Sequence, residues 1–400
     1  MNENDKNIEL RNLYEEVMLP NYAPASFIPE KGIGSSVWDK NNKKYIDFGG
    51  GIAVNSLGHS NPELIQALHK QSHKIWHVSN YISNEPAIKL AKQLTDQTFA
   101  DKVYFSNSGS EANEAAIKIA RRFHFENGND KHEIIAFEKS FHGRSLLNIS
   151  LGASENHRKG FGPFPEGIRH ALYNDIESVK NLISKKTAAI IIEPVQGESG
   201  VVPAEEDFLK KIRDLCTDNE ILLIIDEVQS GVGRMGHLFG YMSLNIEPDI
   251  LTSAKGLGGG IPIGATLTTN KIASSMTTGS HGSTFGGNPM VCAVASKVIE
   301  IVSNPIFLDE VKKKEALIIK GLEIISNKFN AFSAIRSSGL WIGCDLEHPY
   351  EINALLNKCY ENGLIAVSAG TSTLRFAPAL NIKEDEIAEG LEKLEQALTK

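Results

Sequence analysis

Between residues 100 and 270, short apolar runs alternate with segments in which apolar residues recur at helical spacing. This alternation is typical of a mostly parallel sheet that is covered by helices. Several of the runs have no polar residue at alternate positions, which predicts strands buried on both faces. The predicted strands span residues 103–105, 134–137, 188–192, 222–225, 250–251 and 263–267.

The pattern changes near residue 300. A long charged helix is predicted over residues 311–325, followed by a smaller β-containing region. The chain then ends in an amphipathic helix with Ile387, Leu391, Leu394 and Leu398 at helical spacing. We therefore predict an α/β protein with a large domain over residues 56–300 and a smaller α+β domain over residues 301–400. Residues 1–55 are expected to pack with the smaller domain.

Composition narrows the choice of partners. The net charge is −8, with acidic and basic residues interspersed, whereas a nucleic-acid-binding protein usually has a strongly basic face. No apolar run approaches the roughly 20 residues that a membrane helix needs, and the N-terminus lacks the apolar stretch of a secretion signal. We therefore expect a cytoplasmic protein that binds neither nucleic acid nor membrane.

Two charged residues follow predicted strands. Lys255 comes soon after the strand that ends at residue 251 and precedes a glycine-rich stretch, 256–260. Open α/β sheets bind ligands at the carboxyl ends of their strands, and glycines leave room for a bulky cofactor. Asp226 ends another apolar run and needs a positive partner there, because an unpaired buried charge is costly. Taken alone, Lys255 could be a solvated loop lysine, and Asp226 a helix cap or half of an ion pair.

Three further segments carry candidate binding residues. Residues 108–110 open a predicted helix, whose free backbone N–H groups and dipole favour a phosphate, although a plain serine cap is the alternative. Phe141 could stack on a planar cofactor, and nearby Arg144 could bind a carboxylate through two hydrogen bonds. Arg375 lies in a predicted late strand and is a second carboxylate-binding candidate, unless it faces water.

Histidines and cysteines suggest no metal site. His69, His73 and His77 recur every four residues on a predicted helix that ends near Trp76. No acid-rich surroundings accompany them, and solvated helix histidines are the commoner case, so we predict no metal. Spacing typical of metal ligands is also lacking among the cysteines, which are predicted to be reduced core thiols: Cys216, Cys292, Cys344 and Cys359.

Together these segments resemble the class III aminotransferases, a family of the fold-type I enzymes that use pyridoxal 5′-phosphate. The resemblance extends from Tyr22 to Pro378 and rests on residues 107–114, 141–144, 193–198, 226–229, 253–260 and 282–289. It implies a mostly parallel seven-stranded sheet, an amino acid and a 2-oxo acid as substrates, and a homodimer with shared active sites.

The resemblance also implies roles for the candidate residues. Lys255 would bind the cofactor covalently and transfer a proton, and Asp226 would pair with the nitrogen of its pyridine ring. Arg375 would bind the α-carboxylate of glutamate or 2-oxoglutarate and would pair with Glu198 in between. The other implied contacts are Gly109 and Ser110 with the phosphate, Phe141 and Val228 with the two ring faces, Gln229 with the ring hydroxyl, Thr284 with the phosphate in the neighbouring subunit, and Arg144 and Ser283 with an acylated amino acid.

Within this family the likeness is strongest to enzymes of acylated diamino acids. It implies transfer of the terminal amino group of N2-acetylornithine to 2-oxoglutarate, giving N-acetylglutamate 5-semialdehyde and glutamate in arginine biosynthesis, with succinyldiaminopimelate as a second substrate. Succinylornithine, ornithine and 4-aminobutyrate stay open as donors, as do an aminomutase and a relative that binds the cofactor without catalysis. Ile52 stands where ornithine aminotransferases carry a tyrosine, which weakens the ornithine alternative. Ser110 replaces the commoner threonine and keeps its hydroxyl.

Overall fold

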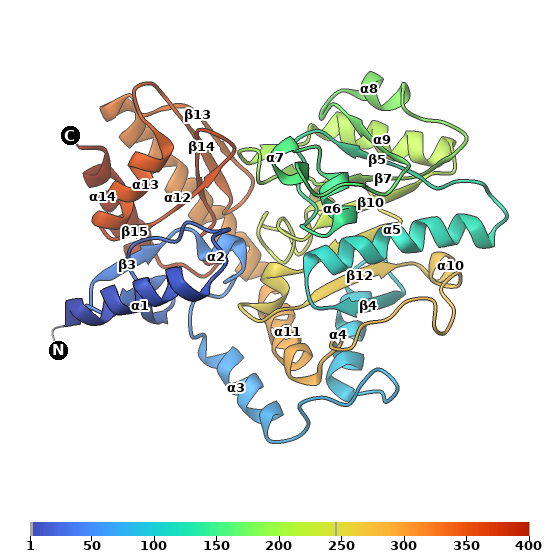
Figure 1. The fold of residues 1–400 in the computed structure, drawn as a ribbon, viewed down its shortest axis with the longest axis horizontal. Helices are drawn as coiled ribbons and strands as arrows, with labels where there is room; N and C mark the ends of the chain where they lie inside the picture. The colour runs from blue at the N-terminus through green and yellow to red at the C-terminus, as the bar shows by residue number, and fades with distance from the viewer. Residues whose placement is uncertain (1–2, 245, 400) are drawn as a thin grey trace.

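The computed structural model describes residues 3–244 and 246–399, and Figure 1 shows a larger and a smaller part. The larger part contains a seven-stranded sheet in the order β4-β12-β11-β10-β7-β5-β6. Strand β12 is antiparallel to both neighbours and the other pairs are parallel, which confirms the predicted sheet. The strands are β4 (Lys102–Ser106), β5 (Glu133–Phe137), β6 (Ile168–Ala171), β7 (Thr187–Ile192), β10 (Leu222–Glu227), β11 (Ile250–Ser253) and β12 (Gly264–Thr268).

Both faces of this sheet are covered, as the unbroken apolar runs predict. In β10, Ile224 joins one core cluster with residues of α5 (Gly109–Glu126), the long helix in front of the sheet in Figure 1. Its neighbours Leu223 and Ile225 join the opposite cluster with residues of α9 (Glu206–Asp218). Burying each such side chain stabilises the fold by about 1.5–3 kcal/mol, so positions 222–225 of the strand all prefer an apolar residue.

The prediction of six strands missed β6, which is an edge strand. It is only four residues long, and the polar residues Arg169 and His170 interrupt its apolar pattern. The guanidinium of Arg169 lies 2.7 Å from Glu133 Oε1 on β5. Charged residues are typical of sheet edges, which explains why periodicity did not indicate a strand here.

The smaller part contains two four-stranded sheets with helices against them. One has the order β1-β2-β3-β15 and the other β13-β14-β17-β16. The parallel pairing of β3 with β15 brings segments from the two ends of the chain together. These strands are β1 (Pro29–Ile33), β2 (Ser36–Asp39), β3 (Lys44–Asp47), β13 (Phe332–Ser337), β14 (Ile342–Leu346), β15 (Leu364–Ile365), β16 (Val367–Ala369) and β17 (Thr373–Phe376).

The remaining elements connect and cover these sheets. Within residues 3–244 and 246–399 no single helix is long and apolar enough to cross a membrane, and α11 with α12 meets that test only as a pair bent by 73°. The remaining helices, short strands and turns are α1 (Glu3–Val17), α2 (Gly50–Ala53), α3 (Pro62–Ser72), α4 (Glu85–Asp96), α6 (Leu146–Leu151), α7 (Glu155–Arg158), α8 (Ile176–Lys180), β8 (Val195–Gln196), β9 (Val202–Pro203), the 3₁₀ turns Gly240–Ser243 and Lys255–Gly258, α10 (Asn270–Ala273), α11 (Pro289–Val302), α12 (Pro305–Phe329), α13 (Ile352–Glu361) and α14 (Glu384–Leu398).

The helix that carries the spaced histidines ends earlier than predicted. Helix α3 stops at Ser72, where the Gln71 side chain donates to Ile75 O and turns the chain. His77 therefore lies off the helix and packs against Phe285, with ring centroids 5.3 Å apart. No group of three or more metal-ligating side chains occurs among the described residues. The four cysteines are free and buried, as predicted.

Candidate active site

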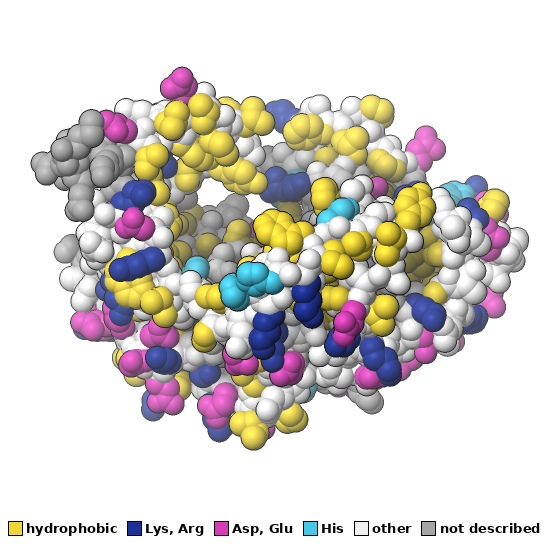
Figure 2. Space-filling view, turned by 90° about the horizontal axis from the view of Figure 1, so that it is seen from below, with side chains coloured by type: hydrophobic (Ala, Val, Ile, Leu, Met, Phe, Trp, Pro, Cys, Tyr) yellow, Lys and Arg dark blue, Asp and Glu magenta, His cyan; other side chains and the backbone are white. Residues whose placement is uncertain are grey.

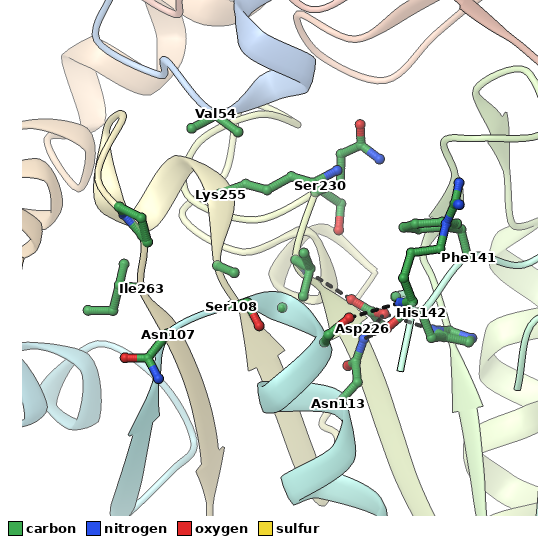
Figure 3. A pocket seen from close by; sticks show the side chains of 18 of the residues that line it. Val54, Asn107, Ser108, Asn113, Phe141, His142, Asp226, Ser230, Lys255 and Ile263 are labelled. Carbon is green, nitrogen blue, oxygen red and sulfur yellow. Dashed lines mark hydrogen bonds and ion pairs between the residues drawn. The ribbon is translucent and has the colours of Figure 1, made fainter. Parts of the chain in front are cut away.

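A cavity of about 390 Å³ lies at the carboxyl ends of the central strands (Figure 3). Asp226 projects from the end of β10, and Lys255 follows β11. Phe141 follows β5, and Glu193 follows β7. Parallel strands place their carboxyl ends at one edge, so residues far apart in the sequence line the same cavity.

Three donors hold the Asp226 carboxylate. Its Oδ2 lies 2.7 Å from His142 Nδ1 and accepts a 2.7 Å hydrogen bond from Asn113 Nδ2. Its Oδ1 accepts from the backbone N–H of Val228 at 2.9 Å. Thr252 Oγ1 in turn donates to Asn113 Oδ1 at 2.7 Å. The carboxylate is therefore fixed, and Figure 3 shows it at the base of the cavity.

Sequence reasoning gave no role to His142 or Asn113. Both side chains are buried, and His142 Nε2 has no hydrogen-bond partner within the part of the chain that the structure describes. His142 stands inside the segment 141–144, and Asn113 lies one turn into α5. Both residues lie within sequence motifs that support the family resemblance, which could have marked them as candidates. Only the fold shows that both side chains reach Asp226.

Lys255 lies in the wall of the cavity with strained backbone geometry. Its φ of 43° is in the left-handed region, which non-glycine residues seldom adopt outside functional sites. Ser56 Oγ donates to the backbone oxygen of Gly256, the residue that follows Lys255, at 2.9 Å. Burial lowers the pKa of Lys255 to about 8, against the opposing effect of Glu198. The amine is therefore neutral far more often than that of a surface lysine. Because Lys255 is desolvated in the cavity wall, it is not a solvated loop lysine.

The start of α5 forms a narrow cradle on the cavity wall. Ser108 caps the helix by accepting from Glu111 N–H at 3.2 Å, and Ser110 Oγ accepts from the backbone N–H of Arg144 at 3.0 Å. A Cβ on Gly109 would lie 2.5 Å from Val228 Cγ1, so glycine is needed for this close approach. The N-terminus of an 18-residue helix offers backbone N–H groups to an anion.

A second carboxyl group, Glu193, lines the cavity near Asp226. It is buried, and its Oε2 accepts from Phe141 N–H at 3.0 Å. Burial, together with the charge of Asp226, raises its pKa well above the ordinary value. Burial therefore favours the protonated form of Glu193 relative to an exposed glutamate.

Gln229 carries an unpaired acceptor. Its Oε1 is buried and has no hydrogen-bond partner among residues 3–244 and 246–399. The residue lines the cavity beside Val228. A buried polar atom of this kind is unfavourable unless a ligand completes its hydrogen bonding.

Arg375 and Glu198 form an ion pair near Lys255. Arg375 lies on β17 and is only 2% exposed, so it does not face water. Its Nη1 lies 2.7 Å from Glu198 Oε1 and donates to Gly197 O at 3.2 Å. Burial raises the pKa of Glu198, but Arg375 outweighs this effect and the pKa is lowered. The carboxylate is ionised and neutralises the guanidinium.

The other predicted residues occupy different places. Arg144 lines the cavity and is exposed, with its guanidinium carbon 5.4 Å from the centroid of the Phe141 ring. Ser283 Oγ accepts from Asn107 Nδ2 at 3.1 Å, and Thr284 lines a separate small pocket beside Asn80. The structure of one chain therefore does not bring Ser283 and Thr284 into the main cavity.

The turn α2 places Val54 at the cavity. All four of its residues have positive φ, including the β-branched Ile52, which is 43% exposed. Asp47 Oδ1 accepts from the N–H groups of Gly49 and Gly50 and so fixes the turn. A Cβ on Gly50 would lie 2.4 Å from the backbone oxygen of residue 377, so the turn packs tightly on the smaller part.

Comparison with known proteins identifies the family. The model of the family described as aminotransferase class-III matches residues 17–398. The chain belongs to the class III aminotransferases. This aminotransferase is 50% identical over 391 residues to acetylornithine/succinyldiaminopimelate aminotransferase of Photorhabdus laumondii, with 97% of each chain covered.

Two solved structures resemble this class III aminotransferase over nearly its whole length. N-acetylornithine aminotransferase from Stenotrophomonas maltophilia has a TM-score of 0.84 at 36% identity, covering 96% of this chain and 97% of that one. Ornithine aminotransferase from Toxoplasma gondii has a TM-score of 0.94 at 29% identity, covering 98% and 94%. The latter holds pyridoxal 5′-phosphate at partial occupancy in its active site. The predicted fold-type I architecture is confirmed.

The enzymes of this family use pyridoxal 5′-phosphate, and the cavity fits that group. The fixed Asp226 carboxylate suits a protonated pyridine nitrogen, and the start of α5 suits a phosphate. The unpaired Gln229 Oε1 suits a ring hydroxyl, which can donate to it. Lys255 supplies an amine of lowered pKa within the same cavity.

Proposed function

We propose that this class III aminotransferase transfers the terminal amino group of N2-acetylornithine to 2-oxoglutarate, giving N-acetylglutamate 5-semialdehyde and glutamate. The names of its relatives at 50% and 36% identity support this choice of donor. Two arginines of different character carry the proposal: Arg375 is paired with Glu198, whereas Arg144 is exposed at the cavity. A site with one masked and one open guanidinium can accept substrates that differ in the position of their carboxylate.

The cofactor contacts proposed for this chain follow the cavity wall. Pyridoxal 5′-phosphate, when bound, supplies the electron sink that allows an amino group to be exchanged. Asp226 would keep the pyridine nitrogen protonated, and Lys255 Nζ would carry the proton that moves to and from the substrate carbon. The proposed holding contacts are Gly109 and Ser110 on the phosphate, Phe141 and Val228 on the ring faces, and Gln229 on the ring hydroxyl.

The two arginines would sort the substrates. Arg144 would hold the carboxylate of acetylornithine that lies far from the reacting amine. Ser283, which lies outside the main cavity of one chain, would join Arg144 from the neighbouring subunit of the proposed homodimer. During that half-reaction Glu198 would stay on Arg375, because a buried guanidinium beside an uncharged chain would lack a partner. With 2-oxoglutarate, Glu198 would move aside and Arg375 would bind the α-carboxylate through two hydrogen bonds.

A homodimer in the cytoplasm is part of the proposal. Thr284 would reach the phosphate of the cofactor in the neighbouring subunit. Two stretches of the chain that meet near Thr284 carry exposed apolar side chains: Trp76 is 65%, Tyr81 100%, Ile82 62% and Phe285 60% exposed. Figure 2 shows the molecule from below, with hydrophobic side chains gathered around a hollow on that face. Large exposed apolar groups of this kind mark interaction surfaces, and a second copy of the chain would cover them.

The amino donor can be tested by comparing the candidate donors one at a time. The purified enzyme, loaded with pyridoxal 5′-phosphate, is mixed separately with acetylornithine, succinyldiaminopimelate, succinylornithine, ornithine and 4-aminobutyrate, and the change in cofactor absorbance is timed. We expect acetylornithine to react fastest, with succinyldiaminopimelate next because a relative carries both names. Ornithine or 4-aminobutyrate reacting fastest would refute this substrate assignment.

A second experiment tests the assignment of Lys255. Lys255→Ala should still bind the cofactor but should lose turnover by many orders of magnitude. Borohydride treatment of the wild-type protein should leave a pyridoxyl label on Lys255, found by peptide mass spectrometry. A label on another lysine would contradict the role of this residue.

A further inference from the structure

The Arg144 guanidinium contacts two aromatic side chains at the cavity, Phe141 and His157. Its carbon is 5.4 Å from the Phe141 ring centroid, and its Nη2 is 3.2 Å from His157 Nε2. The rings of Phe141 and His157 are 6.0 Å apart and meet edge to face at 80°. The Arg144 backbone N–H is also fixed, by Ser110 Oγ at 3.0 Å. An arginine that would otherwise be free to rotate is thus held at both ends.

The contact with His157 fixes the protonation of the imidazole. A guanidinium has only donors, so Nε2 of His157 must accept, and the ring is neutral with its proton on Nδ1. Burial and then the charge of Arg144 lower the pKa of His157, while Glu198 opposes them. Geometry and electrostatics therefore agree on a neutral acceptor.

His157 does not belong to the hydrophobic core. It lies on α7, a helix of four residues that buries none of them. Loss of its imidazole leaves no core cavity, so a large effect on folding is not expected. The described contacts of its imidazole are with Arg144 and Phe141, both of which line the active-site cavity.

We propose that His157 is a positioning residue that sets the affinity for the amino donor by holding Arg144 in the orientation that receives the distant carboxylate. The inference rests on the proposed function, in which Arg144 binds that carboxylate. A fixed guanidinium loses less rotational freedom on binding than a free one, since long side chains lose substantial entropy when immobilised. 2-Oxoglutarate reacts beside its α-carboxylate at Arg375 and should depend less on His157.

The contact is also sensitive to acid. A protonated His157 cannot accept from Arg144 and places a second positive charge beside it, with the Glu198 carboxylate as the other charged group acting on the ring. Because the pKa of His157 is lowered from 6.5, the neutral form persists at neutral pH and is lost only below that value. The KM for acetylornithine should therefore rise as the pH falls below about 6.5.

Two substitutions distinguish the role of His157 as a hydrogen-bond acceptor from its role as an aromatic ring. His157→Phe keeps an aromatic ring and removes the acceptor, whereas His157→Gln keeps an acceptor that does not titrate. We expect His157→Phe to raise the KM for acetylornithine about 3- to 10-fold, the loss of one hydrogen bond, with kcat and the KM for 2-oxoglutarate changed less than twofold. His157→Gln should stay near the wild type at pH 8 and should lose the rise in KM at acid pH.

Controls distinguish this inference from the proposed function. His348→Gln alters an exposed histidine away from the cavity lining and should change neither KM, and equal thermal midpoints should show that all variants fold. If Arg144→Ala does not raise the KM for acetylornithine, the proposed role of Arg144 itself fails. If it does and His157→Phe leaves that KM unchanged, or raises both KM values equally, the positioning role of His157 is wrong and the proposed function stands.

Discussion

His142 Nδ1 lies 2.7 Å from Asp226 Oδ2, and both side chains are buried at the base of the cavity. Asn113 donates to the same oxygen, so the carboxylate that would face the cofactor is supported from behind by two side chains. Hydrogen bonds to a charged group contribute more than neutral ones, about 1.5–3 kcal/mol each. His142 should therefore influence the cofactor without touching the substrate.

His142→Phe removes this donor and keeps a ring of similar size. We expect the dissociation constant of pyridoxal 5′-phosphate to rise about 10- to 100-fold, because Asp226 loses one of its charged hydrogen bonds. Absorbance titration of the apoenzyme measures it. His170→Gln is the control, a partly buried histidine that contacts the backbone of residues 150 and 151 and not Asp226. Equal weakening in both variants would indicate a general loss of folding.

The lowered pKa of Lys255 predicts how the apoenzyme captures its cofactor as pH changes. Only the neutral amine can attack, and its pKa is about 8 instead of the ordinary lysine value of 10.5. The rate of covalent capture should rise with pH and level off above about 8, because the lysine is then mostly neutral. Rapid mixing followed by borohydride trapping measures this rate. A rate that still climbs steeply between pH 9 and 10 would show that Lys255 behaves as an ordinary lysine.

Arg375→Lys separates the two half-reactions. Lysine keeps the positive charge but loses the planar pair of donors that fits a carboxylate. The half-reaction with 2-oxoglutarate should slow about 10-fold or more, while that with acetylornithine should change much less, because Glu198 would occupy Arg375 in that step. Stopped-flow absorbance follows each half-reaction alone. Equal slowing of both would assign Arg375 a general structural role.

A mixed dimer tests the shared active site. Lys255→Ala and Thr284→Ala should each reduce activity when every subunit carries the change. If Thr284 acts on the neighbouring cofactor, a dimer with one subunit of each kind contains one intact site. Coexpression with two affinity tags isolates this dimer, and we expect close to half of the wild-type activity per dimer. Mixed dimers no more active than the Thr284→Ala homodimer would place Thr284 in its own subunit's site, or outside any site.

Hydrophobic periodicity and local motifs predicted most strands of the large sheet and several of the candidate site residues. Unbroken apolar runs such as 188–192 predicted buried strands, because a strand covered on both faces needs apolar residues at every position. The same reasoning missed the edge strand β6 and placed the end of α3 too late, since a polar sheet edge and the hydrogen bond from Gln71 to Ile75 depend on contacts that periodicity does not report. Lys255 and Asp226 were identified by their places after strands and by the family resemblance.

Only the tertiary structure decided which residues act on one another. His142 and Asp226 are 84 positions apart, and Glu198 and Arg375 are 177 apart, so no local pattern could report either contact. Folding also gave Lys255 and Glu193 their shifted pKa values, because desolvation depends on the surrounding packing. Sequence thus determined the elements and the types of residue at the ends of strands, through side-chain chemistry that acts over a few positions. Distances, burial and pairing were decided by the assembly of the sheet and the smaller part around one cavity.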